Sequence, residues 1–217
     1  MGLREVWNFK NCMLIVAHPD DETLWAGGIV LTNPEANWEI ISLCRKSDTD
    51  RNPKFFRALK ELNAIGDIGD LDDGVEQIPL ESSHVKQVIL SLLKKKEYDL
   101  IITHSIKGEY TRHRRHEETG NAVLSLMEKG KLIAKELWMF AYKNGGKEYY
   151  PSAIDNADIF TVLPEEIWNK KQKIITDIYG FSSESWEAKT NPKVEAFWCF
   201  KSVDEVRKKF ISRSEKL

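Results

Sequence analysis

The amino-acid sequence alternates between short, mostly apolar runs of strand length and longer segments in which apolar residues recur at helical spacing. The strand-length runs are 12–17, 38–44, 99–103, 136–142 and 159–163. The segments with helical spacing are 22–31, 53–65, 82–93, 117–127 and 164–175. Strands that alternate with helices in this way are joined by right-handed crossovers, so they lie parallel with helices on both faces. The sequence therefore predicts an α/β fold, a three-layer sandwich with a mostly parallel sheet.

Two stretches of the chain are less regular. Residues 67–74 are rich in Gly and Asp, and Gly66 is a fitting stop for the helix before them, so we expect a loop there. The C-terminal segment 180–217, with its aromatic side chains, fits either a cap or an additional pair of strands. Because 217 residues can close one sizeable core but not comfortably two, we expect a single domain over 1–217.

Composition and charge exclude several classes of protein. The chain is 41% hydrophobic and 30% charged, and its apolar run 12–17 is too short for a membrane helix or a signal-peptide core. We therefore expect a cytoplasmic protein with no membrane span. The net charge of -2 argues against broad capture of nucleic acid. The three cysteines, Cys12, Cys44 and Cys199, lack metal-type spacing, and we expect reduced thiols.

A crowded polar motif follows the first predicted strand. It reads Ala17-His18-Pro19-Asp20-Asp21-Glu22, with three acids and a histidine within five positions. Carboxylates this close repel one another unless a cation or hydrogen bonds offset the repulsion, and a divalent metal does so. Pro19 restricts the backbone and can hold His18 and Asp21 towards one point.

A second motif, Arg112-His113-Arg114-Arg115-His116, follows the predicted strand 99–103 and opens the next helix. The spacing of His113 and His116 places both rings on one helix face. In a parallel sheet both motifs lie beyond carboxyl ends of strands, where ligands bind. Two histidines and one aspartate with an open fourth position are typical of a catalytic zinc site.

Each motif also has an ordinary explanation. A His-x-x-His pair is common on helix surfaces, and acidic residues favour the first turn of a helix electrostatically. The expected meeting of the two motifs in one crevice favours a functional site over both explanations. We give His84 no functional role because it lies on a polar helix start, and we expect a structural or supporting role for His104 at a strand end.

The two motifs together resemble the LmbE-like family, the PIG-L family of N-acetylglucosaminyl-phosphatidylinositol de-N-acetylases. The resemblance extends through 51–74, where the family often has an Arg-started helix ending in Gly and then an Asp-Gly loop, here Asp72-Asp73-Gly74. It covers most of the first 130 residues. Membership implies a Rossmann-like domain, a divalent metal (Zn2+, with Fe2+ as the alternative), and hydrolysis of the acetamide on a glucosamine unit.

On matching positions, the resemblance assigns His18, Asp21 and His116 as metal ligands and Asp20 as general base. His113 can then donate to the oxyanion if it is protonated. Many family members have Gly-His-Pro-Asp-His at the second motif, so this chain lacks the acid between its histidines. That difference leaves the protonation of His113 open.

Nearby side chains suggest contacts to substrate. Tyr110 lies close to a tyrosine position of the family and is a candidate for substrate or oxyanion contact. Arg45 and Arg51 follow the second predicted strand, and arginines also flank the histidines, so we hypothesise that the N-acetylated sugar carries an anionic group. The alternative is that these are solvated arginines paired with neighbouring acids, for which the candidates are Asp48, Asp50, Glu117 and Glu118.

Two other functions stay open. One is a sugar-binding protein of the same fold without turnover, although binding alone has no need of Asp20. The other is metal-dependent phosphoester hydrolysis, which usually requires a second metal, whereas the sequence offers one convincing set of three ligands. The sequence determines neither the sugar nor the number of subunits, and a homo-oligomer stays open.

Overall fold

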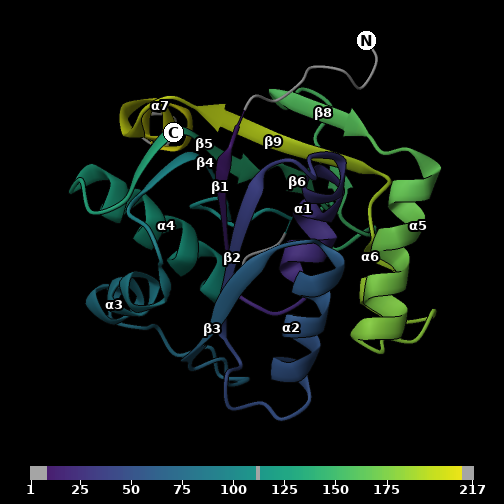
Figure 1. Ribbon diagram of the computed structural model, residues 1–217. Helices are drawn as coiled ribbons and strands as arrows, with labels where there is room; N and C mark the ends of the chain where they lie inside the picture. Colours follow the sequence, from purple (N-terminus) through teal and green to yellow (C-terminus); the bar gives the residue numbers. More distant parts are fainter. Residues whose placement is uncertain (1–8, 111–112, 212–217) are drawn as a thin grey trace.

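The computed structural model describes residues 9–110 and 113–211, which form a central sheet with helices on both faces (Figure 1). In chain order the elements are β1 (Asn11–Val16), α1 (Asp21–Thr32), β2 (Asn37–Cys44), α2 (Arg51–Glu61), β3 (Ile65–Leu71), α3 (Ser82–Leu92), β4 (Glu97–Thr103), α4 (Arg114–Glu128), β5 (Ile133–Phe140), β6 (Tyr142–Lys143), β7 (Ser152–Ala153), β8 (Ile159–Val162), α5 (Glu165–Lys173), the π-helix η1 (Ile174–Ile178), α6 (Trp186–Thr190), β9 (Val194–Phe200) and α7 (Val203–Phe210). The predicted α/β fold is confirmed.

The sheet has seven strands in the order β3-β2-β1-β4-β5-β9-β8. The five strands from β3 to β5 are parallel, and β9 and β8 extend the sheet antiparallel. The order reverses between β1 and β4, because β2 follows β1 on one side and β4 lies on the other. In doubly wound folds this reversal opens a crevice beyond the carboxyl ends of the two strands, and ligands bind there.

The side chains of β1 supply both faces of the sheet with core residues. Leu14 and Val16 pack in one cluster, and Met13 and Ile15 pack in the other. Alternate residues of a strand point to opposite faces, so a strand that is covered on both sides is apolar at every position. This explains the continuous apolar run in the sequence. Helices α1 and α2 cover the first face, and α3, α4 and α7 cover the second.

The predicted loop 67–74 is wrong over its first half, because residues 65–71 form the edge strand β3. Its glycines allow close approach to β2: a Cβ on Gly66 would lie 1.8 Å from the carbonyl oxygen of Ile40, and one on Gly69 would lie 2.8 Å from that of Leu43. Glycine lowers strand propensity, so the pattern indicated a loop. The preceding helix ends at Glu61, earlier than the predicted 65.

Within 180–211, the part of the C-terminal segment that the structure describes, the chain adds the strand β9 to the main sheet. Strand β9 pairs with β5 on one side and with β8 on the other, and α7 packs on the second core. Before β9, the helix α5 continues directly into the π-helix η1. The expectation of a single domain over 1–217 stays a prediction.

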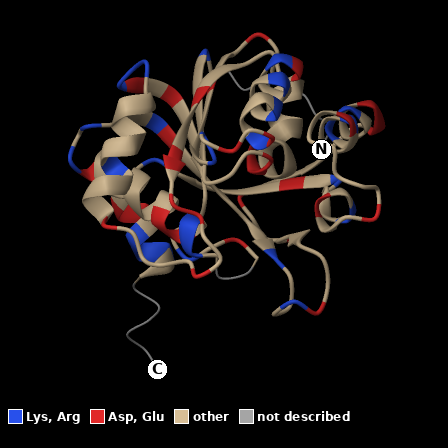
Figure 2. Ribbon diagram, turned by 90° about the horizontal axis from the view of Figure 1, so that it is seen from below, with Lys and Arg blue, Asp and Glu red and all other residues tan. Residues whose placement is uncertain are grey.

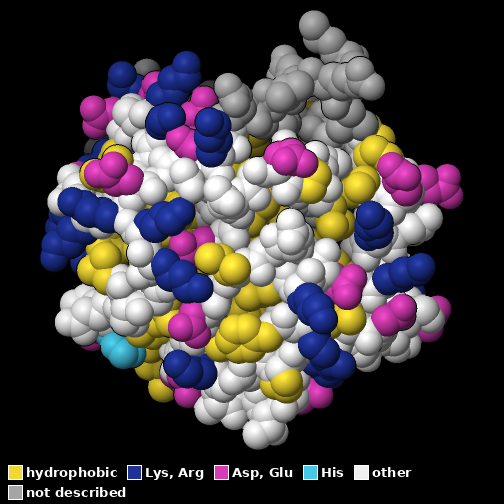
Figure 3. Space-filling view, viewed as in Figure 1, with side chains coloured by type: hydrophobic (Ala, Val, Ile, Leu, Met, Phe, Trp, Pro, Cys, Tyr) yellow, Lys and Arg dark blue, Asp and Glu magenta, His cyan; other side chains and the backbone are white. Residues whose placement is uncertain are grey.

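Charges of both signs are interspersed along the helices (Figure 2) and over the face seen in Figure 3. Within 9–110 and 113–211, the structure contains no helix that is both long and apolar enough to cross a bilayer. Cys12 and Cys44 are buried, Cys199 is half-buried, and all three are free thiols.

Candidate active site

The two sequence motifs meet at the crevice between β1 and β4. His18 follows β1, and Asp21 begins α1. His113 caps the start of α4, and His116 lies in the first turn of that helix. The predicted convergence of His18, Asp21, His113 and His116 is therefore present in the structure.

Three donor atoms form a small triangle at this point. His18 Nδ1 lies 3.1 Å from Asp21 Oδ2, His116 Nε2 lies 3.2 Å from His18 Nδ1, and His116 Nε2 lies 3.4 Å from Asp21 Oδ2. Tetrahedral zinc, with bonds of about 2.0–2.1 Å to nitrogen and oxygen, separates its ligand atoms by about 3.3 Å. The spacing of these three donors therefore fits a tetrahedral divalent metal.

The outward nitrogens of both histidines face carboxylates. His18 Nε2 lies 3.1 Å from Asp73 Oδ1, and His116 Nδ1 lies 2.8 Å from Glu109 Oε2. The inward nitrogens of both rings face Asp21. With a metal in the triangle, the outward nitrogens would donate their N–H groups to Asp73 and Glu109, and the inward lone pairs would face the metal. The two carboxylates therefore suit the histidine tautomers that a metal requires.

Glu109 and His104 are two further residues of this cluster, and the sequence motifs indicated no role for Glu109 and a supporting one for His104. Glu109 is fully buried, and its Oε1 lies 2.8 Å from His104 Nδ1. Burial by itself would raise the pKa of Glu109, but the charges and hydrogen bonds of His104 and His116 lower it to about 2. The available signal was the position of both residues just beyond β4, since titratable groups at such strand ends face the crevice.

His104 supports the donor triangle from one side. Its Nε2 lies 2.9 Å from the backbone nitrogen of Ala17 and 3.5 Å from Asp21 Oδ2. The ring stacks on His116 with centroids 4.0 Å apart. His104 therefore links β1, Glu109 and His116, in agreement with the supporting role expected for it.

Asp20 has a strained backbone. Its φ of 117° lies in a region that side-chain-bearing residues seldom adopt, and such conformations cost about 1–3 kcal/mol. Glu22 holds it there by accepting the Asp20 N–H at 2.9 Å, and the Tyr179 hydroxyl donates to the same Glu22 carboxylate at 2.7 Å. Burial and the neighbouring Asp21 raise the pKa of Asp20 well above its ordinary value, while Arg51 opposes the shift. The environment of Asp20 therefore favours proton uptake.

The two candidate substrate arginines each contact an acid. Arg51 Nη1 donates to Asp20 Oδ2 at 2.9 Å, and its guanidinium lies 4.4 Å from the centre of the Phe181 ring. Arg45 binds Asp73 Oδ2 at 2.5 Å and lies 3.7 Å from Asp48. Both arginines therefore lie beside residues that serve the centre, and the pairing of Arg45 with Asp48 agrees with the alternative weighed from the sequence.

His113 lies against both histidines of the triangle, with ring centroids 4.7 Å from His18 and 4.5 Å from His116. Its Nδ1 is buried and has no hydrogen-bond partner among residues 9–110 and 113–211. Burial, His116 and His18 lower its pKa to about 4, so the ring is neutral at pH 7. A neutral imidazole still carries one N–H, and the unpartnered Nδ1 indicates that a further group belongs in the centre.

The arginines of the second motif do not share one role. Arg115 is 1% exposed and binds the carbonyl of Asp72, the carbonyl of Ile78 and the carboxylate of Glu118. Arg115 is therefore not available to an anionic group of a substrate, because its guanidinium links the 72–78 loop to α4. Arg112 lies outside the described residues.

Aromatic side chains form one wall beside the triangle. Trp25 Nε1 donates to Asp21 Oδ1 at 3.0 Å, and the Trp25 ring centre lies 5.1 Å from that of Tyr110. Tyr110 in turn lies 6.2 Å from His116 and 5.5 Å from Trp186. The structure thus places Tyr110 near the centre, as expected, and adds Trp186 from the C-terminal part of the chain.

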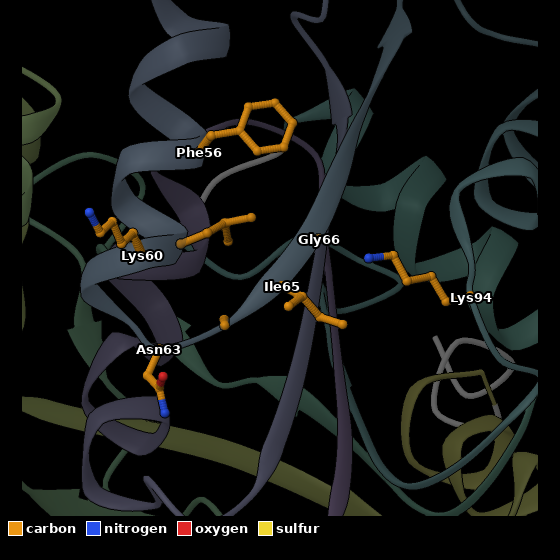
Figure 4. Close-up of a pocket in the computed structure, with 8 residues that line it drawn as sticks. Phe56, Lys60, Asn63, Ile65, Gly66 and Lys94 are labelled. Carbon is orange, nitrogen blue, oxygen red and sulfur yellow. The ribbon is translucent and has the colours of Figure 1, made fainter.

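A separate surface hollow lies at the other end of the sheet (Figure 4). Its lining includes Phe56, Lys60 and Asn63 from α2 and the α2–β3 turn, Ile65 at the start of β3, and Lys94. The triangle lies beyond the carboxyl ends of the parallel strands, whereas this hollow lies at the amino end of β3. It is therefore not part of the candidate active site.

Comparison with known proteins gives a family match over both motifs. A family profile described as PIG-L, GlcNAc-PI de-N-acetylase, matches residues 13–127. The Uncharacterized protein L374 of Acanthamoeba polyphaga mimivirus is 26% identical over 186 residues, which cover 78% of this chain and 75% of that protein. The matched region contains every residue of the donor triangle.

Solved structures share the fold at low sequence identity. An N,N'-diacetylchitobiose deacetylase from Pyrococcus horikoshii superposes with a TM-score of 0.65 and 13% identity, covering 93% of this chain and 88% of that chain. GalB, the 4-carboxy-2-hydroxymuconate hydratase from Pseudomonas putida, superposes with a TM-score of 0.56 and 12% identity, covering 88% and 95%. One fold thus carries two different reactions, so the reaction must be argued from site residues.

Proposed function

Because the chain belongs to the PIG-L family of GlcNAc-PI de-N-acetylases, we propose that it is a metal-dependent hydrolase that removes the acetyl group from an N-acetylglucosamine-type sugar or conjugate. The observation that carries this proposal is the donor triangle of His18, Asp21 and His116 with Asp20 beside it. We further propose that residues 1–217 form one deacetylase domain.

The donor set fits a single divalent metal, for which Zn2+ is our first choice and Fe2+ the alternative. Asp73 and Glu109 would stabilise the histidine tautomers that a metal requires, and the third donor is an ionised carboxylate. Burial opposes ionisation of Asp21, but its histidine partners outweigh burial and hold its pKa well below the usual range. When bound, such a metal polarises the acetamide carbonyl and lowers the pKa of water.

Asp20 is the proposed general base. Its carboxylate lies outside the triangle, its Oδ2 accepts from Arg51, and its side chain is 15% exposed. It accepts one proton from the attacking water and returns it to the nitrogen of the departing amine. The pKa of Asp20 is raised towards neutral pH, and a group with such a pKa can both accept and return a proton efficiently.

His113 is the proposed hydrogen-bond donor to the oxygen that becomes negative during attack on the acetyl carbon. The neutral ring supplies this donor through its N–H, without prior protonation. We assign the other outward contacts of the substrate to Tyr110, Arg45 and Arg51. Arg45 is the better candidate for an anionic group on the sugar because its side chain is 44% exposed.

The two alternatives find less support in the site. A protein that only binds sugar gains nothing from the strained backbone of Asp20, which costs free energy and places a carboxylate beside the donors. A two-metal phosphoesterase needs enough further donor atoms to hold a second metal beside the first. Within the described part of the chain, the other donor groups are His18 with His113 and His116, and Asp21 with His104 and His116, so each adds only one histidine to members of the triangle.

The test is acetate release from N-acetylglucosamine and its phosphorylated and glycosidic derivatives by metal-loaded protein. We expect the wild type to release acetate and Asp20→Asn to lose at least a hundred-fold in kcat while its metal content is unchanged. We expect Arg45→Ala to leave the binding of neutral sugars unchanged and to weaken the binding of phosphorylated sugars. Metal binding without acetate release from any of these sugars would contradict the proposal.

A further inference from the structure

The C-terminal segment brings an exposed indole to the rim of the candidate site. Trp186 is 40% exposed, whereas Trp25 beside it is fully buried. The ring centres of the two tryptophans are 6.5 Å apart, and Trp186 also lies 5.5 Å from Tyr110. Trp186 begins the short helix α6, well beyond the matched family region 13–127.

The contacts of Trp186 lead directly to the proposed metal ligands. Trp25 donates to Asp21 Oδ1, and Tyr110 lies edge-on to His116 at 6.2 Å. Trp186 is therefore connected to two corners of the donor triangle through Trp25 and Tyr110. A group at this distance can contact the body of a substrate without touching the reacting atoms.

The same segment also reaches the general base. Tyr179 donates to Glu22, which holds the Asp20 backbone, and Phe181 stacks on the guanidinium of Arg51. Tyr179 and Phe181 anchor the chain before Trp186, and Trp168 Nε1 donates to the carbonyl of Asn191 after it at 3.1 Å. Ser185 Oγ also accepts the N–H of Ala188 at 3.1 Å at the start of α6. The segment is thus a fixed wall of the crevice.

We propose that Trp186 is a specificity-determining residue whose exposed indole stacks on the apolar C–H face of the pyranose ring of the substrate. The proposal rests on the proposed deacetylase function. In an N-acetylated aminosugar the acetamide nitrogen is attached directly to the ring, so an acetyl group at the triangle places the ring beside the triangle. Exposed aromatic rings next to a polar centre are typical of sites that bind amphipathic ligands.

The experiment measures binding apart from turnover. We compare Trp186→Ala, Trp186→Phe and the control Phe160→Ala, each in metal-loaded Asp20→Asn protein, by calorimetric titration with N-acetylglucosamine and competition with N-methylacetamide. Phe160 is 44% exposed on β8 and is a matched aromatic on another part of the surface. We expect Trp186→Ala to weaken binding of the sugar by about ten-fold and Trp186→Phe by less than about three-fold.

N-methylacetamide carries the amide without a ring, so its binding should be the same in all variants. In turnover assays with Asp20 intact, Trp186→Ala is expected to raise KM while kcat stays within a few-fold of wild type. Equal sugar binding by Trp186→Ala and wild type would overturn the stacking role, as would an equal loss for the ringless amide. Acetate release by the wild type is scored separately, so failure of the deacetylase function and failure of the stacking role give different results.

Discussion

The carboxylate of Glu109 lies 2.8 Å from Nδ1 of His116, while Nε2 of the same ring faces Asp21 at 3.4 Å. Glu109 thereby fixes which nitrogen of His116 carries the proton and which is available to a metal. Many family members have an aspartate between the two histidines of the second motif, where this chain has Arg115. Glu109, seven residues before His116, provides a buried carboxylate for that ring.

Replacing Glu109 by glutamine should weaken metal binding. An amide is uncharged and cannot accept from both His104 and His116 through two equivalent oxygens, so we expect a loss of about 10–100-fold in metal affinity. Competition with a chelating dye measures the affinity. Glu76→Gln, at an exposed position of the neighbouring loop, should leave it unchanged. Equal affinities for Glu109→Gln and wild type would refute the positioning role.

Metal binding should release protons. Burial lowers the pKa of His18 and His116, but their carboxylate partners outweigh it and raise both above the ordinary value of 6.5. Protonated, they stabilise the metal-free protein below pH about 6.5, and this stabilisation is lost as the pH rises through the raised pKa values. Metal affinity should therefore increase with pH. Titrations in two buffers of different ionisation enthalpy measure the protons released, and identical heats would contradict this.

Removing Arg51 should shift the acidic limb of the pH–activity profile. Asp20 is a base only when ionised, and Arg51 is the cation that opposes the rise of its pKa. In Arg51→Ala the pKa of Asp20 should rise further, so the acidic limb of kcat/KM moves to higher pH. Arg57→Ala on the exposed side of α2 is the control, and its profile should match wild type. A shift of the limb to lower pH would exclude Asp20 as the base that Arg51 modulates.

Replacing Tyr179 by phenylalanine should affect both stability and turnover. The variant loses the hydrogen bond from the Tyr179 hydroxyl to the buried Glu22 carboxylate, which we expect to lower the free energy of unfolding by about 1–3 kcal/mol. Because Glu22 holds the Asp20 backbone, kcat should fall while metal content stays constant. Denaturant titration and kinetics measure the two effects. Tyr149→Phe at an exposed position is the control. An unchanged kcat in Tyr179→Phe would contradict the proposed support of Asp20 by Tyr179.

Breaking the ion pair between Lys171 and Glu195 should strongly lower the free energy of unfolding. Both side chains are fully buried 2.6 Å apart, and Glu195 also accepts the N–H groups of Gly28 and Ile29 in α1. Lys171→Met leaves Glu195 uncompensated, so we expect a loss of about 3–5 kcal/mol in the free energy of unfolding. Lys189→Met, whose partner Glu184 lies at the surface, should unfold like wild type. Addition of Glu195→Gln to Lys171→Met should recover part of the loss if the uncompensated charge is the cause.

Much of the fold could be predicted from the sequence because its signals are local. The apolar run of β1 and the helical spacing of α4 follow from burial on both faces of a strand and on one face of a helix. The strand β3 could not be predicted this way, because Gly66 and Gly69 lie so close to the backbone of β2 that a Cβ would clash with it. That requirement comes from a neighbour distant in sequence.

The sequence by itself determined which chemical groups are available and roughly where they meet: His18 and Asp21 in one short motif and His113 and His116 in another. Short spacing restricts such groups to one turn, and parallel topology brings two strand ends together. Only the tertiary structure decided the contacts between distant segments. Glu109 reaches His116 and His104, Tyr179 supports Asp20 through Glu22, and Trp186 joins the rim, because packing rather than sequence spacing sets these distances.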